Sequence, residues 1–350
     1  MSKSGPDRVQ SVFSRPKLAL VLGAALILVL PLLVRDAYIQ HMIIEVLWFG
    51  YIAACWNIIS GYTRQVSLGH AVFVGVGAYT SVILYREAGI SPWIGMLAGA
   101  LVAALVSLLI GYPTLKLVGI YFVMATFGLV EIFRVLFSNI VDLGPINVGG
   151  VDGLTLPQRG NDLLAFQFLG KEYYYYIIVL MMAVIMYFTH WMEHSRLGFY
   201  LRAIKGDEDA AHSLGINVTR YKVMTFAISA AFAAVGGSFF AQFTLFIEPG
   251  RIFGWPLSFE MLLITMIGGR GTLWGPLLGT IILTPIQEIV RTTVGGGAFA
   301  GLHLLIWGIL IIVIVFFMPK GISGLIQIGY RRLKSRLLSS AAAGVREEAQ

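Results

Sequence analysis

The sequence predicts an all-α, polytopic membrane protein of about ten transmembrane helices. Hydrophobic residues make up 57% of the 350 residues and charged residues only 12%, whereas soluble domains carry about 25% charged residues. The apolar residues form runs close to the ~20 residues of a membrane span, without the two-residue alternation of a transmembrane β-barrel. The net charge of +7 does not indicate nucleic-acid binding, because the basic residues cluster at the ends of apolar runs.

Apolar runs bounded by charge, Pro and Gly give ten candidate spans. They are residues 18–34, 43–60, 71–85, 93–111, 120–140, 173–191, 223–247, 257–268, 274–290 and 303–318. The third and eighth are short enough for a tilted, broken or re-entrant segment, so we expect eight to ten crossings and favour ten. The first run resembles a signal peptide, but "RDAYIQHM" follows it without a small-residue cleavage site. We therefore interpret it as a retained span.

The distribution of Lys and Arg predicts the orientation of these spans. These residues gather in three segments, residues 1–17, 192–222 and 319–350. The long loop 141–172 holds only two of them, Arg159 and Lys171. Cytoplasmic segments of membrane proteins are rich in Lys and Arg. We therefore expect the three basic segments in the cytoplasm and loop 141–172 outside, around a transmembrane domain of residues 18–318.

The chain contains a faint internal repeat. A shift of about 180 residues aligns the second to fifth spans with the seventh to tenth. The stretch "PWIGMLAGA" then falls on "TLWGPLLGT", and Gly95 and Gly99 match Gly275 and Gly279. The two copies would have opposite orientations, as in many transporters. The alternative is chance alignment of glycine-rich apolar sequence.

Polar residues inside spans are costly and are therefore candidates for a substrate path. Glu131 lies three residues before Arg134 on one helix face, so an ion pair and a path role are both open. Glu45 lies near a span start and can reach the membrane surface. The stretch "GYTRQVSLGHAVFVGVGAYT" that begins at Gly61 fits either a tight turn or a broken helix beside the route. The candidate path residues are Asn57, Gln65, Ser67, Gly69, Thr126 and Glu131.

The motifs of nucleotide-binding and metal-dependent enzymes are absent from the sequence. It holds no G-x-x-x-x-G-K-[ST] loop and no H-E-x-x-H, and "IGGRGTLWG" follows no predicted strand. The single cysteine, Cys55, excludes a thiolate metal cluster. We therefore expect no catalytic residues, no metal site and no cofactor bound by this chain.

The predicted cytoplasmic loop contains the polar run "GDEDAAHSLG", residues 206–215. Asp207, Glu208 and Asp209 stand where a helix start favours negative charge. Gly215 suits a helix stop. The run predicts a short helix with a small-residue face that fits a partner's pocket, and the alternative is a solvated connecting loop.

The D-A-A-x-x-x-G part of this run resembles the E-A-A-x-x-x-G loop of bacterial ABC importer permeases, with Asp209 in place of the usual Glu. The chain is also similar, over about residues 40–325, to LivM-type permeases of branched-chain amino acid importers. The similar stretches are "GYTRQVSLGHAVFVGVGAY", "GIYFVMATFGLVEIFR", "GGVDGL", "RLGFYLRAIKGDEDAAHSLGINVTRYK" and "MIGGRGTLWGPLLG". Arg64 replaces the usual Gly, and Ile120 stands where a polar residue is common. A urea or short-amide importer therefore remains the alternative.

This resemblance implies a coupling helix that docks on an ATPase subunit. The residues it assigns to coupling are Arg202, Glu208, Asp209, Ala210, Ala211 and Gly215. It also implies a second permease subunit, two cytoplasmic ATPase subunits that bind ATP and Mg²⁺, and an extracytoplasmic substrate-binding protein above loop 141–172. We therefore expect an inner-membrane permease for branched-chain or related amino acids, with a stand-alone secondary transporter less favoured.

Overall fold

The computed structural model describes residues 29–31, 33–34, 36–158, 160, 162–294, 308–309, 321–322 and 324. The first and tenth predicted spans and both tails lie wholly or mostly outside the described residues. The retained first span, the total of ten crossings and the positions of the tails therefore stay predictions.

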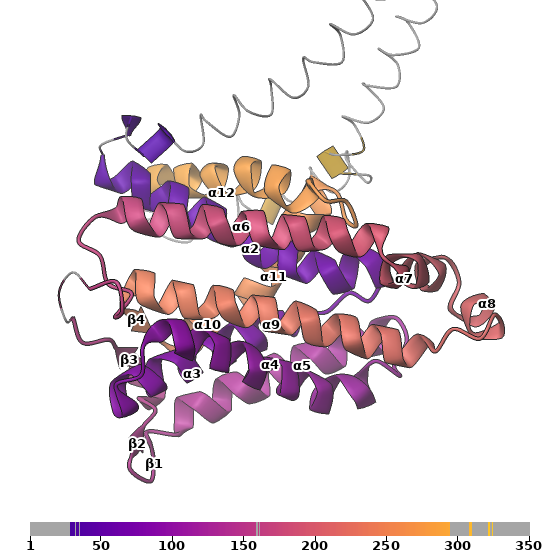
Figure 1. The fold of residues 1–350 in the computed structure, drawn as a ribbon, viewed down its shortest axis with the longest axis horizontal. Coiled ribbons are helices and arrows are strands. Elements are labelled where there is room, and N and C mark those ends of the chain that lie inside the picture. Colours follow the sequence, from indigo (N-terminus) through magenta and orange to yellow (C-terminus); the bar gives the residue numbers. More distant parts are fainter. Residues whose placement is uncertain are drawn as a thin grey trace, which may run out of the picture.

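Within the described residues the chain is a bundle of long helices, most of which run along one direction (Figure 1). They follow the second to ninth predicted spans in order. These helices are α2 (Ala37–Thr63), α3 (His70–Ala88), α4 (Pro92–Thr114), α5 (Ile120–Asn139), α6 (Lys171–His194), α9 (Val218–Thr244), α11 (Trp255–Gly268) and α12 (Gly275–Val294). Of the described helices, 5 are long and apolar enough to cross a membrane, namely α2, α4, α5, α6 and α9. The predicted all-α, polytopic class is confirmed.

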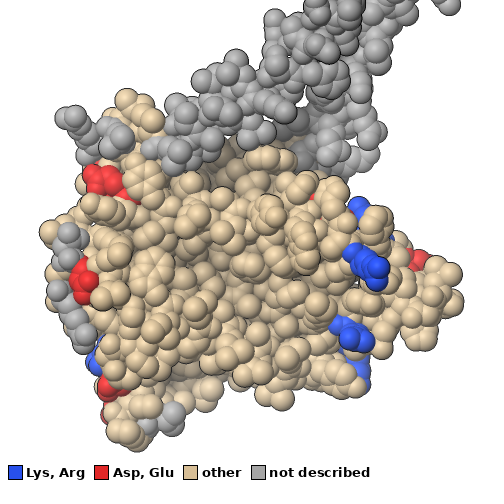
Figure 2. Space-filling model, in the orientation of Figure 1, with Lys and Arg blue, Asp and Glu red and all other residues tan. Residues whose placement is uncertain are grey.

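Short elements distinguish the two ends of the bundle (Figure 1). One end, here named the strand end, carries β1 (Asp142–Leu143) paired with β2 (Ile146–Asn147), η1 (Gly150–Asp152), β3 (Leu154–Thr155) paired with β4 (Phe246–Ile247), and α10 (Pro249–Ile252). Both strand pairs are antiparallel. The opposite end, the α8 end, carries α7 (Arg196–Gly206) and α8 (Glu208–Ser213). In Figure 2 the Lys and Arg side chains gather towards the α8 end and most acidic side chains towards the strand end.

The burial of α2 and that of α5 differ sharply, although both helices are apolar. Every α2 residue from Tyr51 to Thr63 is buried, because α2 packs against α6, α9, α11 and α12. A helix that is apolar on all sides is suited to this central place. In α5 only Phe122, Thr126 and Val130 are buried, at a spacing of four residues. The rest of its apolar surface faces outward, as expected for a helix beside lipid or a partner subunit.

Two helix hairpins occupy matching positions of the predicted repeat, and within each hairpin the two helices approach each other closely at a glycine. A Cβ added to Gly99 of α4 would lie 3.0 Å from the carbonyl oxygen of Gly77 in α3. A Cβ added to Gly279 of α12 would lie 2.0 Å from the carbonyl oxygen of Ile264 in α11. Small residues allow this closeness between helices in a membrane. The shared packing is consistent with the repeat.

The eighth predicted span is short in the structure as well. Helix α11 has 14 residues, which corresponds to a length of about 21 Å. The hydrocarbon core of a bilayer is about 30 Å thick. Helix α11 is therefore shorter than the hydrocarbon core is thick, and it packs along α12 and α2.

Candidate functional site

Helix α8 and the turn after it are built by local capping. The side chain of Asp207 accepts a hydrogen bond from the backbone N–H of Ala210 at 2.9 Å and starts the helix. Gly215 follows the helix with φ +82°, a conformation that favours glycine. The predicted short helix and turn are therefore present, and α8 projects from its end of the bundle (Figure 1).

The exposed surface of α8 is small and partly apolar. Ala211 is buried against the rest of the chain, whereas Asp209 and Ala210 are exposed. Leu214, at the turn, has 80% of its surface exposed. The small-residue pair that the sequence suggested is thus divided between the two sides of the helix. Ala210 and Leu214 are available to a partner, and Ala211 holds α8 in place.

An ion pair joins α8 to the start of α9. The Lys222 ammonium is buried and donates to the Glu208 carboxylate at 2.5 Å. A buried ammonium requires such a partner, because an unpaired charge away from water is costly. Glu208 was predicted to contact an ATPase, and in this structure it positions α8. The Arg202 guanidinium lies 4.5 Å from the centre of the exposed Phe199 ring on α7.

Polar side chains predicted for the substrate path form hydrogen bonds near the α8 end. The Asn57 side chain donates to the carbonyl of Thr272 at 3.0 Å and accepts from the backbone N–H of Gly271 at 2.8 Å. These bonds fix the end of α2 to the turn between α11 and α12. The hydroxyl of Thr126 accepts from the backbone N–H of Leu68 at 3.1 Å.

Residues 64–69 form the connection between α2 and α3. The structure shows an irregular connection between two separate helices, and its place beside a substrate route stays a prediction. Gln65 and Ser67 are buried within it, and the backbone N–H of Gly69 donates to the Ser67 hydroxyl at 3.1 Å. The His70 ring lies between the hydroxyls of Ser67, at 3.2 Å, and Ser229, at 2.8 Å. A role of these side chains in transport stays a prediction.

Glu131 forms the predicted ion pair with Arg134 on α5, where Arg134 Nε donates to Glu131 Oε2 at 2.9 Å. Both side chains are partly exposed on the outer face of this helix. Glu131 is therefore not brought together with Asn57 and Ser67. Its place in a substrate path stays a prediction.

Three basic side chains meet at the α8 end. Arg64, with φ +61°, donates to the carbonyl of Lys205 at 3.4 Å. Arg270 Nε donates to the carbonyl of Ser60 at 2.8 Å, while its buried Nη2 has no hydrogen-bond partner among the described residues. Burial lowers the pKa of Lys205, and the charges of Arg270 and Arg64 lower that pKa further. No local sequence pattern predicts this cluster, because its members are far apart in the chain.

A cavity of about 370 Å³ opens at the strand end between α2, α10, α11 and α12. Its lining includes Arg251 of α10, which pairs with Glu45 of α2 at 3.4 Å, and Glu260 of α11. A second cavity of about 250 Å³ adjoins it and shares Phe49, Arg251 and Glu260. Glu45 was predicted to reach the membrane surface, and this site was not predicted. In the sequence, the acidic residues at several span ends were the feature that pointed to a charged site.

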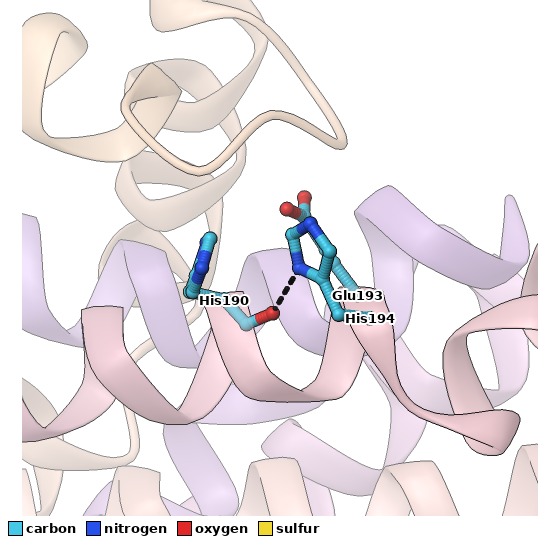
Figure 3. A group of neighbouring side chains, drawn as sticks. All are labelled: His190, Glu193 and His194. Atoms are coloured by element: carbon cyan, nitrogen blue, oxygen red, sulfur yellow. Dashed lines mark hydrogen bonds between the residues drawn. The ribbon is translucent and has the colours of Figure 1, made fainter.

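Helix α6 brings three potential metal ligands together near the α8 end (Figure 3). The ligand atoms of His190, Glu193 and His194 all lie within 4.8 Å of one another. This group was not predicted, although its spacing of three and four residues places the side chains on one helix face. The Glu193 carboxylate already accepts from the Tyr62 hydroxyl, and His194 Nδ1 lies 2.8 Å from the His190 carbonyl. Both histidines are exposed, so the group lacks the enclosure of a structural metal site.

Comparisons with known proteins give matches over most of the chain. Residues 38–315 match the family described as the permease component of branched-chain amino acid transport systems. The chain is 29% identical over 285 residues to a high-affinity branched-chain amino acid transport system permease protein, LivM, of Salmonella typhimurium, and 28% identical to that of Escherichia coli K12. Each alignment covers 76% of this chain and 65% of the relative.

A shorter similarity links the chain to LivH of Escherichia coli K12, a second permease protein of the same description, with 32% identity over 136 residues. That alignment covers 39% of this chain and 42% of LivH. No solved structure matches the chain.

Proposed function

Because this chain belongs to the family of permease components of branched-chain amino acid transport systems, we propose that it is the membrane-spanning permease of an ATP-driven importer of branched-chain amino acids. The observation that carries this proposal is α8, a capped helix with the exposed residues Ala210 and Leu214, which projects from a bundle of apolar helices. Such a helix is suited to receive the movement of a partner and pass it to the spans.

The proposal gives each end of the bundle a side of the membrane. The α8 end faces the cytoplasm, in line with its Lys and Arg residues, and docks on an ATPase subunit. The strand end faces outward, beneath a substrate-binding protein. A second permease subunit covers part of the outward-facing apolar surface. ATP and Mg²⁺ bind the ATPase subunits, and this chain contributes no catalytic residue.

A urea or short-amide importer is the alternative within the same class. It is distinguished by uptake of labelled leucine and labelled urea in cells with and without this chain, at low external concentration. Loss of leucine uptake alone supports the proposal. Loss of urea uptake alone replaces it with the alternative.

The docking role of α8 is tested by Ala210→Arg. The added side chain projects from an exposed position, so the bundle still folds while a complementary pocket no longer accepts the helix. We expect at least a tenfold loss of leucine uptake and loss of substrate-stimulated ATP hydrolysis in the assembled complex. Val118→Arg places the same charge at another exposed turn and is expected to leave uptake unchanged. Normal uptake by the Ala210→Arg variant would show that α8 does not dock on the ATPase subunit.

A further inference from the structure

The two adjoining cavities at the strand end combine a charged part with an apolar part. The larger one is lined by side chains of both charge signs, including Arg251, Glu45 and Glu260. The smaller one is lined by Trp48, Phe240, Ile252 and Leu257, all of them buried. Phe49, Arg251 and Glu260 line both cavities, so the charged and the apolar cavity adjoin at these three side chains.

From this arrangement we propose that the two cavities form a binding site for an α-amino acid with an apolar side chain, on its way into the permease. The inference rests on the proposed function, which it deepens by locating where this chain itself contacts the substrate. The substrate's carboxylate binds Arg251, its ammonium binds Glu45 and Glu260, and its side chain enters the apolar cavity.

The charged groups have the geometry that a zwitterion needs. An α-amino acid carries its two charges one carbon apart, so its site requires a donor and an acceptor that are close neighbours. Arg251 Nη2 lies 3.4 Å from Glu45 Oε1, which is a long contact, and the Arg251 side chain remains 58% exposed. A guanidinium has five N–H donors. Several are therefore available for a paired interaction with a carboxylate.

The Arg251 guanidinium also lies close to the apolar cavity. It lies 5.0 Å from the centre of the Phe240 ring, and that ring stacks on Trp48 with centroids 4.1 Å apart. The Trp48 indole donates to the carbonyl of Gly236 at 2.8 Å. The aromatic wall is thus rigid, and it places the substrate's side chain beside its charged head group.

The apolar cavity is large enough for a branched side chain. Its volume is about 250 Å³, whereas an apolar protein cavity of roughly 150 Å³ binds benzene. Urea is uncharged and has no apolar part, so it would leave the charges of Arg251 and Glu45 unmatched and the aromatic wall uncovered. The cavities therefore favour amino acids over urea as the substrate class.

The first test is the rate of labelled leucine uptake, as a function of concentration, in cells that express the complete transporter. Arg251→Gln and Glu260→Gln are expected to lower the uptake efficiency (kcat/KM) by about tenfold each, as for the loss of a charged hydrogen bond. The matched controls Arg86→Gln and Glu87→Gln remove the same charges at the outer end of α3, where they line neither cavity. They are expected to behave as the unmodified chain.

A third cavity variant is assessed by a ratio of uptake rates, which does not depend on how much protein reaches the membrane. Leu257→Phe puts a larger side chain into the lining and so reduces the volume of the apolar cavity. It is therefore expected to lower the ratio of leucine to valine uptake at least threefold, because valine is one carbon shorter. A merely structural role of Leu257 would leave this ratio unchanged.

The outcomes separate the two proposals. If the unmodified transporter imports leucine and all three cavity variants keep its efficiency and its leucine to valine ratio, the binding site is overturned and the permease function stands. If the unmodified transporter imports no branched-chain amino acid, the proposed function falls, and the site falls with it.

Discussion

At the strand end, Arg251 and Glu45 face each other beside an open cavity, whereas at the α8 end Arg64, Lys205 and Arg270 crowd together. Opposite charges around a space offer two contacts to a small zwitterion. Like charges repel each other and raise the energy of the folded chain. The difference fits the proposals that the strand end binds a solute and that the α8 end docks on another macromolecule.

The largest effect is expected when bulk is added at the α8 end alone. Gly215→Trp is expected to reduce leucine uptake more than tenfold without changing the ratio of leucine to valine uptake. Gly215→Ala shares the backbone cost of an L-residue at φ +82°, roughly 1–2 kcal/mol, but adds little bulk, so it is expected to keep most uptake. Equal losses in both variants would attribute the effect to backbone strain and not to docking.

A smaller effect is expected from the ion pair that positions α8. Glu208→Gln leaves the buried Lys222 ammonium without its carboxylate, which is expected to lower the stability of the purified chain by about 1–3 kcal/mol in thermal unfolding. Replacing both residues, as Glu208→Gln with Lys222→Met, is expected to restore part of the loss. If Glu208→Gln reduced uptake with unchanged stability, Glu208 would contact the ATPase directly.

The smallest effect is expected within the basic cluster. Lys205→Gln removes one of three neighbouring charges and is expected to raise stability at neutral pH, within roughly 1 kcal/mol, because solvent screens these charges in part. The pKa of Lys205 is lower in the folded chain than in the unfolded chain, so the unmodified chain gains stability as the pH rises from the folded pKa to the unfolded pKa. The advantage of Lys205→Gln is therefore expected to shrink at alkaline pH.

A matched variant shows whether this gain comes from the cluster. Lys116→Gln removes a positive charge near the start of α9, away from Arg64 and Arg270. It is expected to give no such gain, and an equal gain would mean that net charge alone is responsible.

The sequence predicted well those features that depend on interactions between residues close together in the chain. The span order followed from apolar runs, and α8 followed from Asp207 before it and Gly215 after it, because capping acts within a few residues. The Glu131–Arg134 pair was predictable for the same reason. Glu45 and Arg251 are 206 positions apart, and no local pattern joins them. The strand-end cavities could therefore be found only once the helices were packed.

The short span α11 has a consequence for how the protein enters the membrane during its synthesis. A helix of about 21 Å exposes too little apolar length to remain alone in a bilayer core of about 30 Å. Its contact with α12 is close, since Gly268 and Gly279 allow the two backbones to approach. We therefore expect the translocation machinery to release α11 into lipid only after α12 has emerged from the ribosome, so that the two helices insert together as a hairpin.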